Sequence, residues 1–415
     1  MKKTPEALCQ EREKRATDAI ELRIPDRVPV MANAGYFPAK YGGITCSAAW
    51  YDFDSWFEAC KKTLRDFEPD FGGPQPFFPG KAYDYLEPQT VKLPGNGAPP
   101  NNSHQSIELD FMKSDEYSAL ISDPSDYTLR TYFPRVYKSL AGFEALPKIS
   151  EMGGFFMSVD ALALALVKPE VIAAIEALQQ TGREILKWRS KMEEFNREVE
   201  SYGFLPFVQG VVIAPFDIIS HSFRGMNGTM QDMFRQPDKL QAACEKLLEI
   251  TLDKPMPPPN RFGNIRIGIP LTRGSDNFMS LQHFETFYWP TLKKLMQTLI
   301  ERGATLCPFF EGNFDSRLEY LLELPKGKFL AHLDNSDIFR AKEILKGHCC
   351  IQGNVSVTML QFGTTDEVKD ACKKLIDVVG KDGGLILSPR SSLDKVNPEN
   401  LKTMIEFTKE YGVYR

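Results

Sequence analysis

Short β-rich runs alternate with longer stretches of helical spacing along the second half of the chain. Between residues 281 and 302 the apolar side chains recur three or four positions apart, which predicts a helix with one buried stripe. Thr364 and Glu367 form a capping-box pattern at the start of another helix. Further helices are expected at 338–345 and after the Asn-Pro pair at 397–398. This alternation is typical of βα units.

Eight such runs predict eight strands. They are residues 27–31, 67–71, 206–213, 266–269, 304–310, 329–333, 349–355 and 385–389. Because a (β/α)8 TIM barrel has this number of strands, we predict an α/β fold with one barrel domain over residues 1–415, preceded by an extra N-terminal segment. Residues 73–160 break the rhythm and begin rich in Pro and Gly, so we expect a long insertion after the second strand. Helical spacing returns at 161 and runs to about 201.

Composition excludes several classes of protein. The chain has 50 Lys and Arg against 55 Asp and Glu, and it lacks the basic stripe that nucleic-acid binding needs. No apolar run reaches the roughly 18 to 20 residues of a membrane helix, and no apolar core follows the N-terminal lysines, so we expect a cytoplasmic protein. The 8 cysteines include no Cys-x-x-Cys pair, which argues against a disulfide framework and a zinc ribbon.

Polar side chains follow the predicted strands at the end where barrel enzymes place their active sites. They are Arg273 and Asp276 after the fourth strand, Glu311 and Asn313 after the fifth, His332 and Asp334 at the sixth, Asn354 at the seventh and Arg390 after the eighth. His221 lies farther beyond the third strand. Together these residues form the candidate site.

Each candidate has a functional and a structural interpretation. Glu311 follows two phenylalanines, so an apolar wall would raise its pKa and suit it to general acid catalysis; alternatively it forms an ion pair with Arg273 or Arg390. His332 is either a buried core histidine or a site residue that shares a strand face with Asp334.

The remaining candidates are similarly open. Asp276 would orient a substrate or cap a helix that begins near residue 280. Arg390 would hold a carboxylate through its guanidinium group or act in stability. Asn313 and Asn354 adjoin glycines and would bind substrate or serve tight turns.

The strand-end motifs resemble the uroporphyrinogen decarboxylase superfamily, which includes corrinoid-dependent methyltransferases. The similar segments are Glu-Gly-Asn at 311–313, Ile-Gln-Gly-Asn-Val at 351–355, Phe-Gly-Thr at 362–364, Gly-Gly-Leu-Ile-Leu at 383–387, Pro-Glu-Asn at 398–400, Arg-Val-Pro-Val at 27–30 and Phe-Glu-Pro-Asp-Phe at 67–71. The resemblance implies a (β/α)8 barrel with its cavity at the strand C-termini, in agreement with the strand count.

The chain departs from both branches at their functional residues. The thiol-methylating members carry zinc on a His-x-Cys motif before a Gly-Asn turn, whereas this chain has Phe309-Phe310-Glu311 there and Arg390-Ser391-Ser392 after the last strand. Uroporphyrinogen decarboxylase has an arginine-rich segment after the first strand, whereas residues 32–41 contain no arginine. A coenzyme M type zinc reaction and a polyanionic porphyrinogen substrate are therefore not expected.

The leading hypothesis is a methyl-transferring enzyme of the corrinoid-linked branch, such as a demethylase component that acts on a small methoxylated or aromatic molecule. Glu311 would protonate the leaving group, while Asp276, His332, Asp334 and Arg390 would orient the substrate. Tyr36 and Phe310, with Phe309 and Phe278, would supply an apolar wall.

Partners and rival functions follow from the same residues. We expect a small-molecule substrate, a corrinoid on a partner protein and no tightly bound cofactor, with a weak alternative metal set of Glu311, His332 and Asp334. The first rival is a decarboxylase of a smaller carboxylated molecule, in which Arg273 or Arg390 would bind the carboxylate. The second is a non-catalytic ligand-binding barrel. The sequence is compatible with a monomer or an oligomer.

Overall fold

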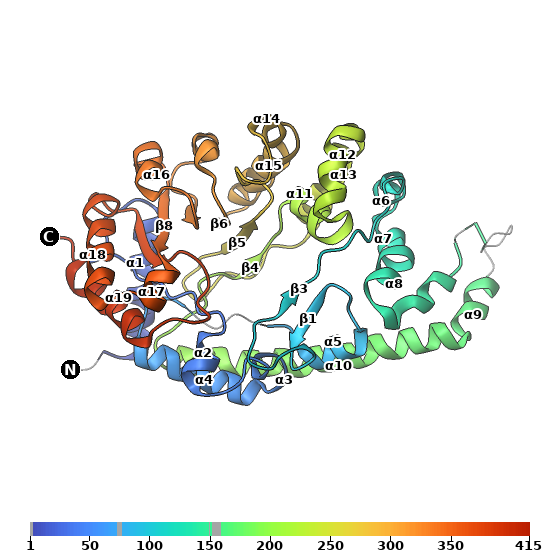
Figure 1. The fold of residues 1–415 in the computed structure, drawn as a ribbon, viewed down its shortest axis with the longest axis horizontal. Coiled ribbons are helices and arrows are strands. Elements are labelled where there is room, and N and C mark those ends of the chain that lie inside the picture. Colours follow the sequence, from blue (N-terminus) through green and yellow to red (C-terminus); the bar gives the residue numbers. More distant parts are fainter. Residues whose placement is uncertain (1–2, 73–76, 149, 152–158) are drawn as a thin grey trace.

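A six-stranded parallel sheet forms the centre of the protein, and its strands are neighbours in chain order. The computed structural model describes residues 3–72, 77–148, 150–151 and 159–415. The strands are β4 (Gly210–Val211), β5 (Arg266–Leu271), β6 (Thr305–Phe310), β7 (Leu330–Leu333), β8 (Cys350–Val355) and β9 (Leu385–Pro389), seen in part in Figure 1. The predicted α/β class is therefore confirmed.

The first two predicted strands are present only as single parallel bridges. Val30 pairs with Leu387 of β9, and Met31 pairs with Phe71. The carboxylate of Asp70 accepts a hydrogen bond from the Val30 N–H at 2.9 Å, so a side chain takes the place of a regular ladder bond. The segments at 27–31 and 67–71 thus extend the row of parallel segments beyond β9 without forming full strands.

The third predicted strand, residues 206–213, is also shorter than expected. Only Gly210–Val211 (β4) is paired as a strand. Just before β4, the side chain of Gln209 accepts the N–H of Arg266 at 2.8 Å, so this N–H is not available to a backbone carbonyl of the strand. The ring of Phe207 lies 5.0 Å from that of Phe71, which brings the two ends of the row of parallel segments together.

Helices follow the strands as the periodicity predicts. They include α13 (Pro237–Asp253), α15 (Trp289–Glu301), α16 (Ile338–Leu345), α18 (Thr365–Val378) and α19 (Pro398–Tyr411). The capping box of Thr364 and Glu367 is present, and Asn397 caps α19 through the Glu399 N–H. The helix predicted at 281–302 is divided into α14 (Leu281–His283), a π-helical turn and α15, and the change falls next to Pro290, which has no N–H to donate.

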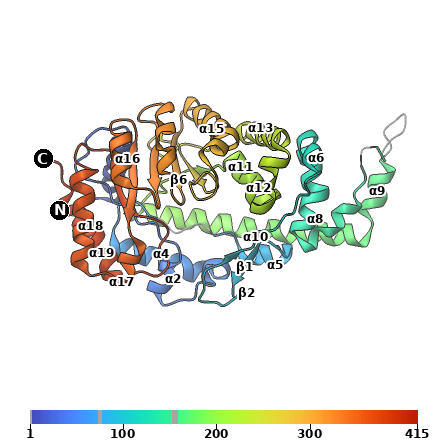
Figure 2. The same cartoon turned by 45° about the horizontal axis from the view of Figure 1, so that its top comes forward.

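The region expected to be an insertion contains its own small elements. They are α5 (Gly80–Leu86), the short strands β1 (Val91–Pro94), β2 (Gly97–Ala98) and β3 (Gln105–Ser106), and the helices α6 (Tyr117–Ser122), α7 (Pro124–Tyr127) and α8 (Phe133–Val136). The helical signal predicted from 161 to 201 corresponds to α9 (Asp160–Leu166) and α10 (Pro169–Glu200). Helix α10 runs along the lower edge of the molecule in Figure 1 and across its middle in Figure 2.

The N-terminal segment is α1 (Pro5–Ile20), and it joins the sheet through a buried ion pair. The guanidinium of Arg266 at the start of β5 lies 2.7 Å from the carboxylate of Glu13, and both side chains are almost fully buried. Hydrogen bonds from Asn260 and Asn264 to Glu13 complete the pair. The extra N-terminal segment is therefore part of the core.

All eight cysteines are buried, and none forms a disulfide. Burial raises the pKa of thiols such as Cys307, to about 12, so they are packed as neutral groups. Among the described helices, none combines the length and the apolar character that crossing a membrane requires.

Candidate functional site

A cavity of about 550 Å³ lies at the carboxyl ends of the strands. Its walls include Phe309 of β6, His332 of β7 and Gln352 of β8, while Met192 and Phe195 of α10 close it from the side of that helix. Parallel α/β sheets bind their ligands at this edge. The cavity is therefore the geometric centre of the candidate site.

Strand alternation decides which residues of the Phe-Phe-Glu segment face the cavity. Phe309 lines it, whereas Phe310 is buried on the opposite face and packs edge-on against Phe314 at 5.1 Å. Phe310, predicted to be part of the substrate wall, is therefore a packing residue. The Glu311 N–H donates to the Leu271 carbonyl at 3.0 Å, so Glu311 directly follows β6 at the rim and is not among the residues that line the cavity.

Glu311 is a carboxyl group with a raised pKa at this rim. Desolvation at the strand ends is the main cause, and repulsion from Asp334 and Asp217 adds to it, while attraction to Arg273 opposes it. Its side chain remains exposed, so the proton can exchange with solvent. The pKa of Glu311 is therefore raised, as predicted, but by desolvation together with the nearby carboxylates and not by the phenylalanine wall alone.

A hydrogen-bonded network at the ends of β4 and β5 is centred on Asp217, in α11 (Pro215–Ile218). This buried carboxylate accepts from the Tyr288 hydroxyl at 2.6 Å, the Arg273 N–H at 2.9 Å and the Thr272 hydroxyl at 3.1 Å. Burial raises its pKa, although these donors counteract the rise. Asp217 therefore holds the loop after β5 in place.

His221 connects this network to Arg273. Its Nε2 lies 2.5 Å from the Thr272 hydroxyl, and its Nδ1 lies 3.2 Å from an Arg273 nitrogen. Because the Thr272 hydroxyl donates to Asp217 and Arg273 can only donate, His221 must carry its proton on Nε2. Burial and the charge of Arg273 lower its pKa, in agreement with a neutral ring.

Sequence reasoning found His221 and Arg273 but missed Asp217 and Glu108, which pairs with the Arg273 guanidinium. One signal was available, because Asp217 precedes His221 by four positions in a helical segment and such residues share a face. Glu108 lies in the region expected to be an insertion, and nothing in its local sequence indicates this contact.

His332 and Asp334, which were predicted to share a strand face, have different partners. The His332 ring is buried against Phe309 at 4.6 Å between ring centres, and burial lowers its pKa to about 4. Asp334 instead accepts from the Gly312 N–H at 3.0 Å and from Asn335 at 2.9 Å. His332 lines the cavity, whereas Asp334 follows the end of β7 at Leu333 and is not among the lining residues.

Asp276 and Asn313 have structural partners. Arg317 forms an ion pair with Asp276, and the Ser316 hydroxyl donates to it at 3.0 Å. Asn313 accepts the Asp315 N–H at 2.8 Å, which is the turn interaction that its alternative interpretation predicts. Asp276 does not cap the helix near residue 280, which Ser280 caps; instead it accepts the Ser316 N–H at 3.2 Å, in the first turn of the 3-10 helix Asp315–Glu323.

Asn354 and Arg390 extend the site along β8 and β9. Asn354 donates to the Ser336 carbonyl at 3.3 Å, and Arg390 donates to the Asn335 side chain at 2.8 Å. Within the described chain, the Nε atoms of Arg390 and Arg273 are buried without a hydrogen-bond partner. Both arginines thus have unused donor capacity.

Tyr36 lies in a separate aromatic cluster. Its hydroxyl accepts from Trp50 at 2.7 Å and contacts His104 at 2.9 Å, while its ring stacks on Phe77 at 4.7 Å. Burial raises its pKa to about 12. Tyr36, which was predicted to be part of the substrate wall, packs in this cluster and is not among the residues that line the cavity.

The alternative metal set is not assembled. His332 directs Nε2 toward the Pro389 carbonyl, and Asp334 is committed to Gly312, so neither converges with Glu311. Within the described ranges, no three His, Cys, Asp or Glu side chains come together in a way that would hold a metal ion. The residues in place of the family's zinc motif, Phe309-Phe310-Glu311 and Arg390-Ser391-Ser392, do not fit zinc.

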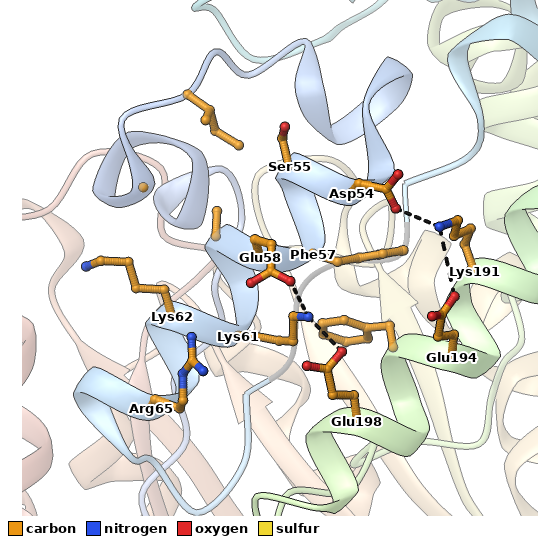
Figure 3. Close-up of a pocket in the computed structure, with 14 residues that line it drawn as sticks. Asp54, Ser55, Phe57, Glu58, Lys61, Lys62, Arg65, Lys191, Glu194 and Glu198 are labelled. Atoms are coloured by element: carbon orange, nitrogen blue, oxygen red, sulfur yellow. Dashed lines mark hydrogen bonds and ion pairs between the residues drawn. The ribbon is translucent and has the colours of Figure 1, made fainter.

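A larger surface groove of about 1030 Å³ separates α4 (Phe53–Phe67) from α10 (Figure 3). Lys61 pairs with Glu58 and Glu198, and Lys191 pairs with Asp54. The pairs Lys61–Glu198 and Lys191–Asp54 connect the two helices, whereas Lys61–Glu58 lies within α4. The groove contains none of the predicted site residues.

Comparisons with known proteins match this architecture. Residues 206–411 match the family model of uroporphyrinogen decarboxylase. Uroporphyrinogen decarboxylase of Chlorobium phaeobacteroides is 35% identical over 83 residues, which are 19% of this chain and 23% of that protein. That of Chlorobaculum parvum is 34% identical over 80 residues, 18% of this chain and 22% of that protein. These matches span about a quarter of the relatives' length.

A solved structure matches over almost the whole chain. A methyltransferase from Methanosarcina mazei superposes with a TM-score of 0.60 at 15% identity and covers 96% of this chain and 98% of its own. At this identity the likeness concerns the fold. The resemblance inferred from the strand-end motifs is confirmed.

Proposed function

We propose that this chain, whose residues 206–411 belong to the uroporphyrinogen decarboxylase family, transfers a methyl group from a small methylated molecule to a corrinoid on a partner protein. One observation carries the proposal. Glu311, a carboxyl group with a raised pKa, directly follows β6, two residues after Phe309, which lines the cavity. An acid beside an apolar cavity suits protonation of a leaving oxygen.

In this mechanism the C–O bond of a methoxy group breaks and its electron pair stays on the oxygen, while the methyl group passes to a reduced corrinoid, a co-substrate that would supply the electron pair of the new bond. Glu311 donates its proton to the departing oxygen, which leaves as an uncharged hydroxyl. The resulting carboxylate is stabilised by Arg273 and regains a proton from solvent. Asp217 and His221 position Arg273 for this role.

We further propose that the sheet closes into the predicted (β/α)8 barrel within one domain. In support, Val30 and Phe71 extend the six strands to eight parallel segments, and Phe71 meets Phe207 just before β4. The methyltransferase match over 96% of the chain supports the same arrangement.

The test is methyl transfer from methoxybenzene or 2-methoxyphenol to a reduced corrinoid protein. Glu311→Gln should lower the rate by about a hundredfold or more, since general acid catalysis typically contributes a factor of 10² to 10⁴. Glu343→Gln, on the exposed face of α16, is the matched control and should retain the rate. Unchanged transfer by Glu311→Gln would remove Glu311 from the mechanism, and absence of transfer to any corrinoid protein would favour the non-catalytic barrel.

A decarboxylase is the second candidate, favoured by the free Nε donors of Arg273 and Arg390 and by the family match. Release of CO2 from an aromatic carboxylate, lost in Arg390→Met and retained in the exposed control Arg183→Met, would support it. Methyl transfer without CO2 release would count against it.

A further inference from the structure

The described walls of the strand-end cavity carry no formal charge. Asp, Glu, Lys and Arg are all missing from its described lining residues, although charged groups make up 25% of the chain. Its polar contributors are neutral and include Asn33, Asn196, Gln352 and Ser391. Most other lining residues are apolar, so the cavity differs in chemistry from the charged rim at Glu311 and Arg273.

The nearest arginines are screened from the cavity or paired elsewhere. Arg266 lies behind the ring of Phe207 at 4.9 Å and is neutralised by Glu13. Arg273 is paired with Glu108. Arg390 precedes the lining Ser391, but it donates to the Asn335 side chain at 2.8 Å and is not among the lining residues. A carboxylate inside the cavity would therefore lack a cation to replace its hydration, and burying such an unpaired charge is costly.

The histidine in the wall does not supply that charge either. Burial keeps His332 neutral near pH 7, because its pKa is lowered to about 4. Its ring lies beside Phe309 at 4.6 Å, so the two form an aromatic wall with a polar edge. The amide of Gln352 already donates weakly to Ser388 and Met31 at 3.3 Å. The cavity can thus form a hydrogen bond with one weakly polar group on an otherwise apolar molecule.

We infer that this cavity binds an uncharged, mainly apolar small molecule, such as a methoxylated aromatic ring, and discriminates against its carboxylated analogues. A volume of about 550 Å³ is suited to a ligand of one or two rings. The inference rests on the proposed function, because the ligand is the methyl donor. Binding nevertheless needs no corrinoid and no methyl transfer, so it can be measured alone.

The first experiment titrates the full chain with methoxybenzene, 2-methoxyphenol and 4-methoxybenzoate at neutral pH, followed by ligand-observed NMR. The two uncharged probes should bind at least about tenfold more tightly than the benzoate. Equal or tighter binding of the benzoate would overturn the inference, and so would a lack of binding by both uncharged probes at millimolar concentration.

The second experiment changes the charge of the wall. Met192→Glu should weaken methoxybenzene binding at least about tenfold, and Met192→Lys should improve 4-methoxybenzoate binding relative to the unmodified chain. Leu186→Glu is the matched control, because it places the same charge on the same helix at a side chain that is 66% exposed. Methoxybenzene binding that is equal in Met192→Glu and Leu186→Glu would place the ligand outside this cavity.

The results separate the inference from the proposed function. Binding of uncharged probes without methyl transfer to a corrinoid protein would support the cavity assignment and remove the methyltransferase proposal. Methyl transfer from 4-methoxybenzoate at a rate equal to that from methoxybenzene would support the methyltransferase and overturn the assignment.

Discussion

The hydroxyl of Tyr288 donates a 2.6 Å hydrogen bond to the carboxylate of Asp217, and both side chains are buried. This contact joins the π-helical turn before α15 to α11, two segments that follow different strands. The same carboxylate holds the N–H of Arg273. The contact thereby connects the stability of the fold to the position of a site residue.

Tyr288→Phe should reduce the free energy of unfolding by about 1–3 kcal/mol, because it leaves a buried carboxylate oxygen without one donor. Urea denaturation measures the change. Tyr85→Phe, whose side chain is 42% exposed, is the control and should change stability by less than about 0.5 kcal/mol. A Tyr288 variant as stable as the control would mean that the contact contributes nothing net.

The rate of methyl transfer should fall as pH rises through the raised pKa of Glu311. The reason is that only the protonated carboxyl can donate a proton to the leaving oxygen. A pH–rate profile at saturating methyl donor shows this limb, with its midpoint above the ordinary range of a glutamic acid. Glu311→Gln should lose the limb, whereas Glu343→Gln should keep it; a limb retained in Glu311→Gln would assign it to another group.

Stability should fall in acid because of His332. Its pKa is lowered to about 4 in the folded protein, so between pH 6.5 and 4 the unfolded chain binds the proton more readily. Stability from this group is complete above about pH 6.5 and declines by up to about 3 kcal/mol toward pH 4.

Denaturation curves at pH 7.5 and 4.5 measure this loss in the unmodified chain and in His332→Gln. The variant should lose less stability than the unmodified chain over the same interval. His348→Gln serves as the control, and it should lose as much as the unmodified chain. Equal losses in all three proteins would show that His332 does not carry the effect.

Glu13→Gln should cost about 3–5 kcal/mol of unfolding free energy, because it leaves the guanidinium of Arg266 buried without its counter-charge. Glu11→Gln breaks the exposed pair with Lys3 and should cost less than about 1 kcal/mol. Thermal and urea denaturation compare the two variants. If both cost the same, α1 would not be held to β5 by this pair.

Local patterns predicted much of the C-terminal half. Hydrophobic periodicity predicts the strands near 266–271 and 305–310, and periodicity together with the capping box predicts the helix at 365–378. All of these signals lie in residues that are close together in the sequence. The strands at 27–31 and 67–71 were overestimated, because the Asp70 side chain replaces part of the ladder. No local sequence pattern indicates that a side chain 40 positions away accepts the Val30 N–H in place of a backbone carbonyl.

For the site, the sequence by itself determined which polar residues follow the strands and which family motifs surround them, since position along a strand sets the end of the sheet that a residue reaches. Only the tertiary structure decided which side chains meet. Helix α10 closes the cavity, Glu108 reaches Arg273, and Asp217 meets Tyr288. These contacts join segments that are far apart in the chain, so their energies depend on packing and burial that no local pattern encodes.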